Sequence, residues 1–136
     1  MSITPKQEKL LARLVETLNQ IQPDGQFDKP PSPQDLARDL RMPYQAVHAV
    51  LNLGVQVGQI KVVEGEYLTV QKIEQMMAAL GTLAKDGFLS TKGFREALGV
   101  SRTWSESIAR YLLDTQHLYR VEGGYSWTKP EDDDED

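Results

Sequence analysis

The segment Val63-Glu64-Gly65-Glu66-Tyr67 has a close counterpart 58 positions later, Val121-Glu122-Gly123-Gly124-Tyr125. The same offset, without a gap, also places apolar residues on apolar residues upstream, for example Leu36 on Phe94. Both segments put glycine-containing turn residues between short runs rich in β-branched and aromatic residues, which is typical of β-hairpins. A repeat of this length predicts that one supersecondary unit occurs twice in the chain.

Helical signals precede each hairpin. Ser32-Pro33-Gln34-Asp35 offers an N-cap serine with proline at the first helical position, and Pro43 separates this short helix from a longer one. In the second copy a short helix starts from Ser90, and Gly99-Val100-Ser101 forms the turn before the long helix. Helix, short helix, tight turn, long helix and hairpin is the winged-helix arrangement. The sequence therefore predicts a mostly α protein with small β-hairpins, built as two tandem winged-helix domains.

Composition agrees with two small domains and an acidic end. The chain has 136 residues and a net charge of −5, but residues 131–136 are all acidic, and the remainder carries +1. We expect winged-helix domains at 1–70 and 71–129 and a disordered acidic tail at 130–136, since adjacent like charges repel one another. The N-terminus lacks the pattern of a secretory signal, and no apolar run is long enough to cross a bilayer. These features predict a cytoplasmic protein without a membrane partner.

Motifs of catalysis and cofactor binding are absent from the sequence. There is no cysteine and no glycine-rich phosphate loop. The two histidines, His48 and His117, have no second histidine at ligand spacing, so a metal site is not expected. We therefore expect no cofactor and no enzymatic activity.

The charge on the two long helices differs. In a winged helix this element reads the groove, with the residues near its N-terminus pointing outward. The first copy offers neutral residues there, among them Gln45 and His48, whereas the second copy is cationic. At the wing, alternation along the strand points Tyr119 outward next to Arg120, as an exposed pair that can stack on an unpaired base. The candidate nucleic-acid-binding residues are Lys92, Arg95, Arg102, Arg110, Tyr119 and Arg120.

Two stretches resemble a known family. Phe88-Leu89-Ser90-Thr91-Lys92-Gly93-Phe94-Arg95-Glu96-Ala97-Leu98-Gly99-Val100-Ser101-Arg102 resembles the last winged-helix domain of the bacterial selenocysteine-specific elongation factor. Pro30-Pro31-Ser32-Pro33-Gln34-Asp35-Leu36-Ala37 looks like the preceding domain of that family. The resemblance implies the C-terminal part of a translation factor that grips a stem-loop in messenger RNA. It also implies that Arg102 begins the recognition helix and that Arg120 leads into the wing.

The leading hypothesis is therefore an RNA-hairpin-binding module of a selenocysteine-specific elongation factor, with the ribosome or another protein as a further possible partner. The first alternative is a tandem winged-helix regulator that binds duplex DNA. The second is a winged-helix module that binds a partner protein, in which the acidic tail discourages nucleic acid.

Overall fold

A computed structural model of the protein describes residues 3–20 and 25–130, and the chain divides into two compact units between Glu74 and Gln75. Apart from Pro130, the predicted disordered tail at 130–136 lies outside the described residues. The expected domain limits, 1–70 and 71–129, stay a prediction.

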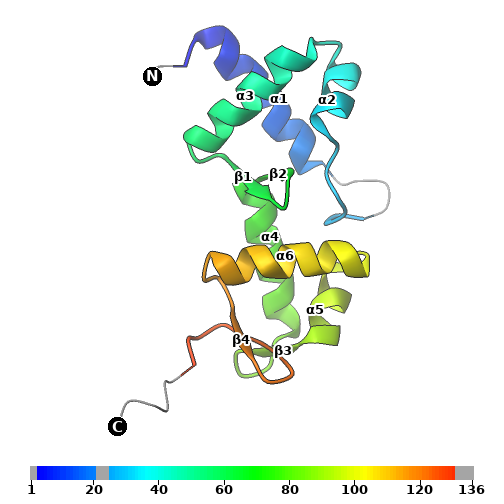
Figure 1. Ribbon diagram of the computed structural model, residues 1–136, viewed down its shortest axis with the longest axis vertical. Helices are drawn as coiled ribbons and strands as arrows, with labels where there is room; N and C mark the ends of the chain where they lie inside the picture. Colours follow the sequence, from blue (N-terminus) through cyan, green and yellow to red (C-terminus); the bar gives the residue numbers. More distant parts are fainter. Residues whose placement is uncertain (1–2, 21–24, 131–136) are drawn as a thin grey trace. The chain divides into compact units, whose positions relative to one another are not determined.

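Unit 1 packs three helices above one hairpin (Figure 1). The elements are α1 (Pro5–Asn19), α2 (Pro33–Leu40), α3 (Tyr44–Gln56), β1 (Ile60–Val63) and β2 (Glu66–Thr69). Apolar residues three and four positions apart on α1 and α3 bury one side of each helix; Leu14, Val47 and Leu51 are fully buried. Glu64 and Gly65 both have positive φ, as a two-residue hairpin turn requires.

The start of α2 follows the predicted capping signal. The Asp35 N–H donates to Ser32 Oγ (3.1 Å), and the Ser32 N–H donates to Asp35 Oδ2 (3.3 Å). These two bonds form a capping box. The bond from the Ser32 N–H lowers the pKa of Asp35, because it stabilises the charged carboxylate.

A buried lysine ties the end of α1 to the start of α4 (Val70–Leu83). Lys72 is only 6% exposed, and its ammonium donates to the backbone oxygens of Gln26 (2.9 Å), Asn19 and Gln20 (both 3.5 Å). The Lys72 N–H also donates to Thr69 Oγ1 (3.1 Å), which in turn donates to the Asn19 side chain. The cation therefore meets the carbonyls of Asn19 and Gln20, which the end of α1 leaves without helical partners, and the Gln26 carbonyl beyond the helix.

Unit 2 repeats the order of the elements. It contains most of α4, then β3 (Phe88–Ser90), α5 (Thr91–Leu98), α6 (Arg102–Asp114), β4 (Tyr119–Val121) and β5 (Gly124–Ser126). Every bound of α5 and α6 lies 58 positions after its counterpart in α2 and α3, for example Thr91 after Pro33 and Arg102 after Tyr44. The mostly helical winged-helix fold with small antiparallel hairpins confirms the predicted fold class.

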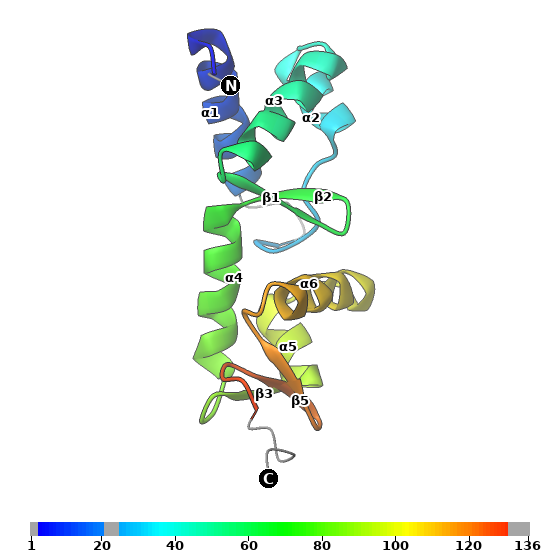
Figure 2. The ribbon, with the colours of Figure 1, turned by 60° about the vertical axis from the view of Figure 1, so that its left-hand side comes forward.

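The sheet of unit 2 has a strand that the sequence analysis did not predict. β3 pairs antiparallel with β5, which also pairs with β4, so the strand order is β3–β5–β4 (Figure 2). The adjacent glycines Gly123 and Gly124, a pair typical of hairpin turns, do not form this turn together. The turn is Glu122–Gly123, and Gly124 is the first residue of β5, opposite Ser90.

Gly124 is the point where β5 fits against its neighbour. A Cβ built on Gly124 would lie 2.2 Å from the backbone oxygen of Leu89, far inside van der Waals contact. By contrast, a Cβ on Gly81, in the helical part of the same unit, would meet nothing within 4 Å. Only glycine therefore allows β5 to lie beside β3 at this register.

We predict opposite effects of alanine at these two glycines. Gly124→Ala should lower the free energy of unfolding of unit 2 by about 1–3 kcal/mol, because the methyl group forces the strands apart. Gly81→Ala should raise it by about 0.4–1 kcal/mol through the lower entropy of the unfolded helix segment. Chemical denaturation of both variants checks the pair; equal stabilities would contradict the close approach of β5 to β3.

A second prediction concerns the buried lysine. Lys72→Met should destabilise the protein by about 1–3 kcal/mol, because three carbonyls lose their donor. Burial lowers the pKa of Lys72, so at alkaline pH the unfolded chain holds a proton that the folded chain has released. The stability of the wild type relative to the variant should therefore rise as the pH approaches the usual lysine range. Burial also raises the pKa of Tyr111. Because Tyr111 is present in both proteins, its effect on stability cancels in the difference between wild type and variant.

Candidate nucleic-acid interface

The candidate interface is built on the helix-turn-helix of unit 2. Ser90 and Ser101 cap α5 and α6, their hydroxyl oxygens accepting from the N–H groups of Gly93 (3.0 Å) and Trp104 (3.2 Å). Gly99 ends α5 in the left-handed region with φ of 65°. These local signals set the turn between the two helices, and with it the side that α6 presents to solvent.

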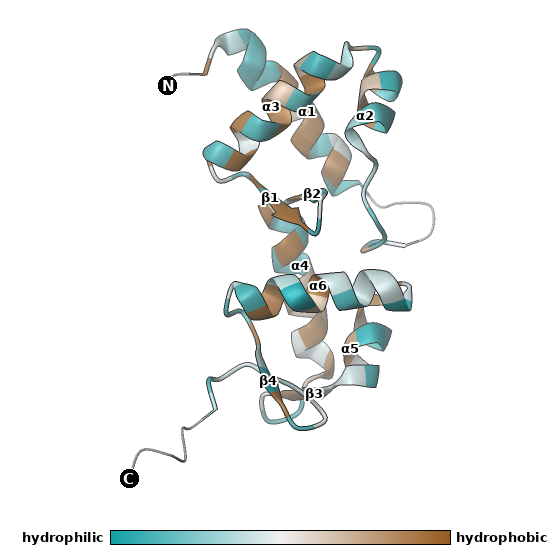
Figure 3. Cartoon of the chain, viewed as in Figure 1, coloured by the Kyte–Doolittle hydropathy of each residue, from teal (hydrophilic) through white to brown (hydrophobic). Residues whose placement is uncertain are grey.

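One side of α6 is buried and the other is polar. The large buried side chains are Trp104, Ile108 and Leu112. The exposed residues are Arg102, Thr103, Glu106, Arg110 and Asp114. In Figure 3, teal bands of hydrophilic residues recur along α6. The exposed side therefore carries two of the candidate cations and one carboxylate at its centre.

Two adjoining hollows gather most of the candidate residues. The first, of about 460 Å³, is lined by Thr91, Lys92, Arg95, Arg102, Ser105 and Glu106. The second, of about 270 Å³, is lined by Thr91, Glu106, Ala109, Arg110, Arg120 and Tyr125. Because Thr91 and Glu106 line both, five candidate cations from α5, α6 and β4 share one surface. We call it the cationic surface: Lys92, Arg95, Arg102, Arg110 and Arg120.

Aromatic contacts hold the arginine of the wing in this surface. The guanidinium carbon of Arg120 lies 5.4 Å from the centroid of the Tyr125 ring, a cation–π distance. Tyr125 is buried, and its ring packs on Phe94 of α5 with centroids 5.0 Å apart. The wing arginine is therefore positioned by a contact that runs back to the helix-turn-helix.

Tyr119 lies apart from these cations. Tyr119 pairs with Ser126 and Arg120 with Tyr125, and neighbouring residues of a strand point to opposite faces. Tyr119 is half-buried and lines neither hollow. Tyr119 and Arg120 therefore lie on opposite faces of the strand, and the role of Tyr119 in nucleic-acid binding stays a prediction.

The sequence analysis missed the role of Glu106. This carboxylate lies at the junction of the two hollows, and its Oε1 is 3.6 Å from Nε of Arg102, which is 81% exposed. The spacing of four residues on α6 is the signal that identifies the pair. Arg110 also has a local partner, since its Nη2 donates to Ser107 Oγ at 3.4 Å. Glu106 repels phosphate, so the junction suits a base edge that donates a hydrogen bond better than it suits a backbone phosphate.

The corresponding face of unit 1 is neutral. α3 contains no lysine or arginine, and its polar side is a run of contacts between neutral groups. The Tyr44 and His48 rings stack with centroids 5.6 Å apart, and Tyr67 Oη donates to Asn52 Oδ1 at 3.3 Å. This helix offers no charge for a phosphate.

Metal sites and membrane spans are absent from the described part of the chain. Within residues 3–20 and 25–130, no group of three or more acidic, histidine or cysteine side chains stands where it could hold a metal ion. In the same ranges, no helix has the length and apolar character needed to cross a bilayer.

Comparison with known proteins identifies a fold relative. No family model matches the sequence, and no curated protein matches it. Among solved structures, the chain is similar to the mRNA-binding domain of elongation factor SelB from E. coli, determined in complex with SECIS RNA. The TM-score is 0.68 at 20% sequence identity, and the match covers 93% of this chain and all of that one. At this identity the likeness establishes the fold.

The geometry of the wing predicts unequal roles for two adjacent residues. Arg120→Ala should weaken binding of a short RNA hairpin by about 1–2 kcal/mol, because it removes a cation held in the surface. Tyr119→Ala should change affinity by less than about 0.5 kcal/mol, since its side chain lies on the other face of the strand. Fluorescence anisotropy at low salt measures both, and a larger loss for Tyr119→Ala would show that this ring reaches the RNA.

Proposed function

We propose that this chain is an RNA-hairpin-binding module of a selenocysteine-specific translation elongation factor. The observation that carries the proposal is the cationic surface, where two helices and a wing bring five cations onto one side of unit 2. The fold likeness to a domain determined with SECIS RNA supports the same reading. The proposal gives the chain a binding role rather than a catalytic one, exercised in the cytoplasm where translation takes place.

The N-terminus of α6 is the proposed centre of recognition. Arg102 is the first residue of the helix. Ser101 Oγ accepts from the Trp104 N–H, while the N–H groups of Arg102 and Thr103 have no carbonyl partner within the helix. A phosphate placed there meets these N–H groups and the guanidinium together. Lys92 and Arg95 line the same hollow from α5 and extend the positive potential along the backbone of the hairpin.

The wing and Glu106 complete the proposed recognition. In this proposal Arg120 contacts the strand that leaves the hairpin loop, and Arg110 lines the same hollow from α6. Glu106 can accept a hydrogen bond from an exocyclic amine of an unpaired base. Since hairpin loops expose such base edges and a duplex presents them only in a groove, this arrangement favours an RNA stem-loop over duplex DNA.

We propose a division of roles between the two predicted winged-helix domains. The segment 71–129 carries the cationic surface, whereas the neutral α3 face of 1–70 takes no part in phosphate binding. Loss of the RNA interaction should therefore follow from substitutions in α5, α6 and the second wing alone.

A titration with a panel of RNA hairpins and duplex DNA at two salt concentrations tests the proposal. Arg102→Ala should weaken binding of the preferred hairpin by about 1–3 kcal/mol. Lys92→Ala should reduce the slope of log affinity against log salt concentration by about one. Gln45→Ala, at the matching end of α3, is the control and should leave affinity unchanged. Equal, weak binding to every probe, unaffected by Arg102→Ala, would falsify the proposal.

A further inference from the structure

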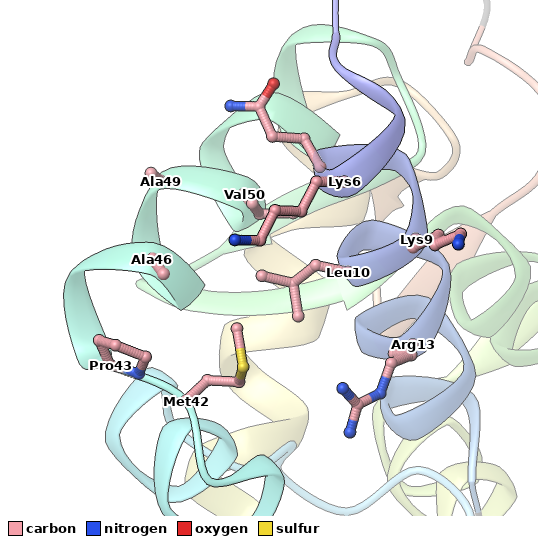
Figure 4. A pocket seen from close by; sticks show the side chains of 10 residues that line it. Lys6, Lys9, Leu10, Arg13, Met42, Pro43, Ala46, Ala49 and Val50 are labelled. Carbon is pink, nitrogen blue, oxygen red and sulfur yellow. The ribbon is translucent and has the colours of Figure 1, made fainter.

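Unit 1 contains an apolar hollow that the proposed function does not use. It has a volume of about 600 Å³ and lies between α1 and the first half of α3 (Figure 4). Leu10, Met42 and Val50 supply its floor, and Ala46 and Ala49 form the side contributed by α3. Its size is within the range of sites that bind apolar groups. A surface of this kind on a folded unit is a candidate for contact with another molecule.

The edge of this hollow is positively charged. Lys6, Lys9 and Arg13 line it from α1, three and four positions apart, so they lie along one side of that helix. All three are exposed, and within the described part of the chain they form no salt bridge. Among the described residues no carboxylate lines this hollow, and Glu8 of α1 lines a different one. Figure 4 shows Lys6 reaching from α1 over the apolar floor.

Apolar floor and cationic edge together define the chemistry of the occupant. A nucleic acid suits the edge but not the floor, since phosphates and sugars cannot replace water against Leu10 and Val50 without loss. The acidic residues 131–136 of this chain suit the edge but include no apolar side chain for the floor. A segment that satisfies both has apolar residues on one side and carboxylates on the other, as an acidic amphipathic helix does.

We propose that the hollow between α1 and α3 binds an acidic amphipathic helix of a partner protein. Its apolar side chains at i, i+3, i+4 and i+7 enter the space between the two helices. Its carboxylates meet Lys6, Lys9 and Arg13, which fix its position along α1 and speed its association. This protein-binding site belongs to unit 1, and none of its residues is part of the cationic surface of unit 2.

Direct titration of the full chain with a labelled helical peptide tests the site. The probe has leucines at i, i+3, i+4 and i+7 and glutamates elsewhere, and its control has lysines in place of the glutamates. We expect saturable binding of the glutamate peptide and at least about tenfold weaker binding of the lysine peptide at low salt. Absence of saturable binding, or equal binding of both peptides, overturns the proposal.

Matched variants locate the binding. Ala49→Glu puts a negative charge in the hollow at a position where the native alanine is already exposed. It should weaken binding of the glutamate peptide at least about tenfold. Gln45→Glu adds the same charge on α3 outside the hollow and should have little effect. Thermal melting checks that both variants fold as the wild type does. Equal effects of the two substitutions would place the peptide elsewhere and overturn the site.

Two competition arms exclude the other occupants. An RNA hairpin should leave peptide binding unchanged, and displacement of the peptide by RNA would make the hollow a nucleic-acid contact instead. A chain ending at Pro130 should bind the peptide within about twofold of the full chain, because the tail has no group that fills the floor. A tenfold gain in affinity for the peptide after truncation would show that the tail occupies the hollow, and would overturn the proposal of a partner protein.

Discussion

The close approach of Gly124 to the Leu89 carbonyl is the constraint on which the candidate interface depends. A side chain at this point would meet the backbone at 2.2 Å, so the three-stranded sheet exists only because the residue has none. The pairing of β5 with β3 and β4 then places Tyr125 against Phe94, and Tyr125 supports Arg120. The charge at the wing is thus positioned by strand packing, and no ion pair among the described residues holds it.

Local sequence signals were sufficient to predict the helices but not the sheet of unit 2. Caps such as Ser32 and Ser90 act within one turn of the chain, and the structure has them where the sequence placed them. The strand β3 spans only three residues and has no pattern of its own. It is a strand because β5 returns beside it, about 35 residues later, and such pairing is invisible to a local pattern. The role of Gly124 was missed for the same reason.

The candidate site could be predicted in part. That cations of α5 and α6 share a surface follows from the helix-turn-helix geometry alone. The position of Tyr119 did not follow, because strand alternation was applied to one residue and not to its neighbour Arg120. The apolar hollow of unit 1 left no trace in the sequence. Its alanines and methionine are ordinary helix and turn residues, and only the packing of α1 on α3 makes them into a surface.

The carboxylate among the cations changes the ionic character of the surface. Glu106 already balances part of the charge of Arg102, and so acts as a counterion that belongs to the protein. A phosphate that reaches Arg102 displaces this carboxylate rather than a mobile ion. Because the salt dependence of nucleic-acid affinity follows the ions released to solution, the affinity falls with salt less steeply than five cations would require. The salt dependence of such a surface is therefore shallower than that of a purely basic patch of equal size.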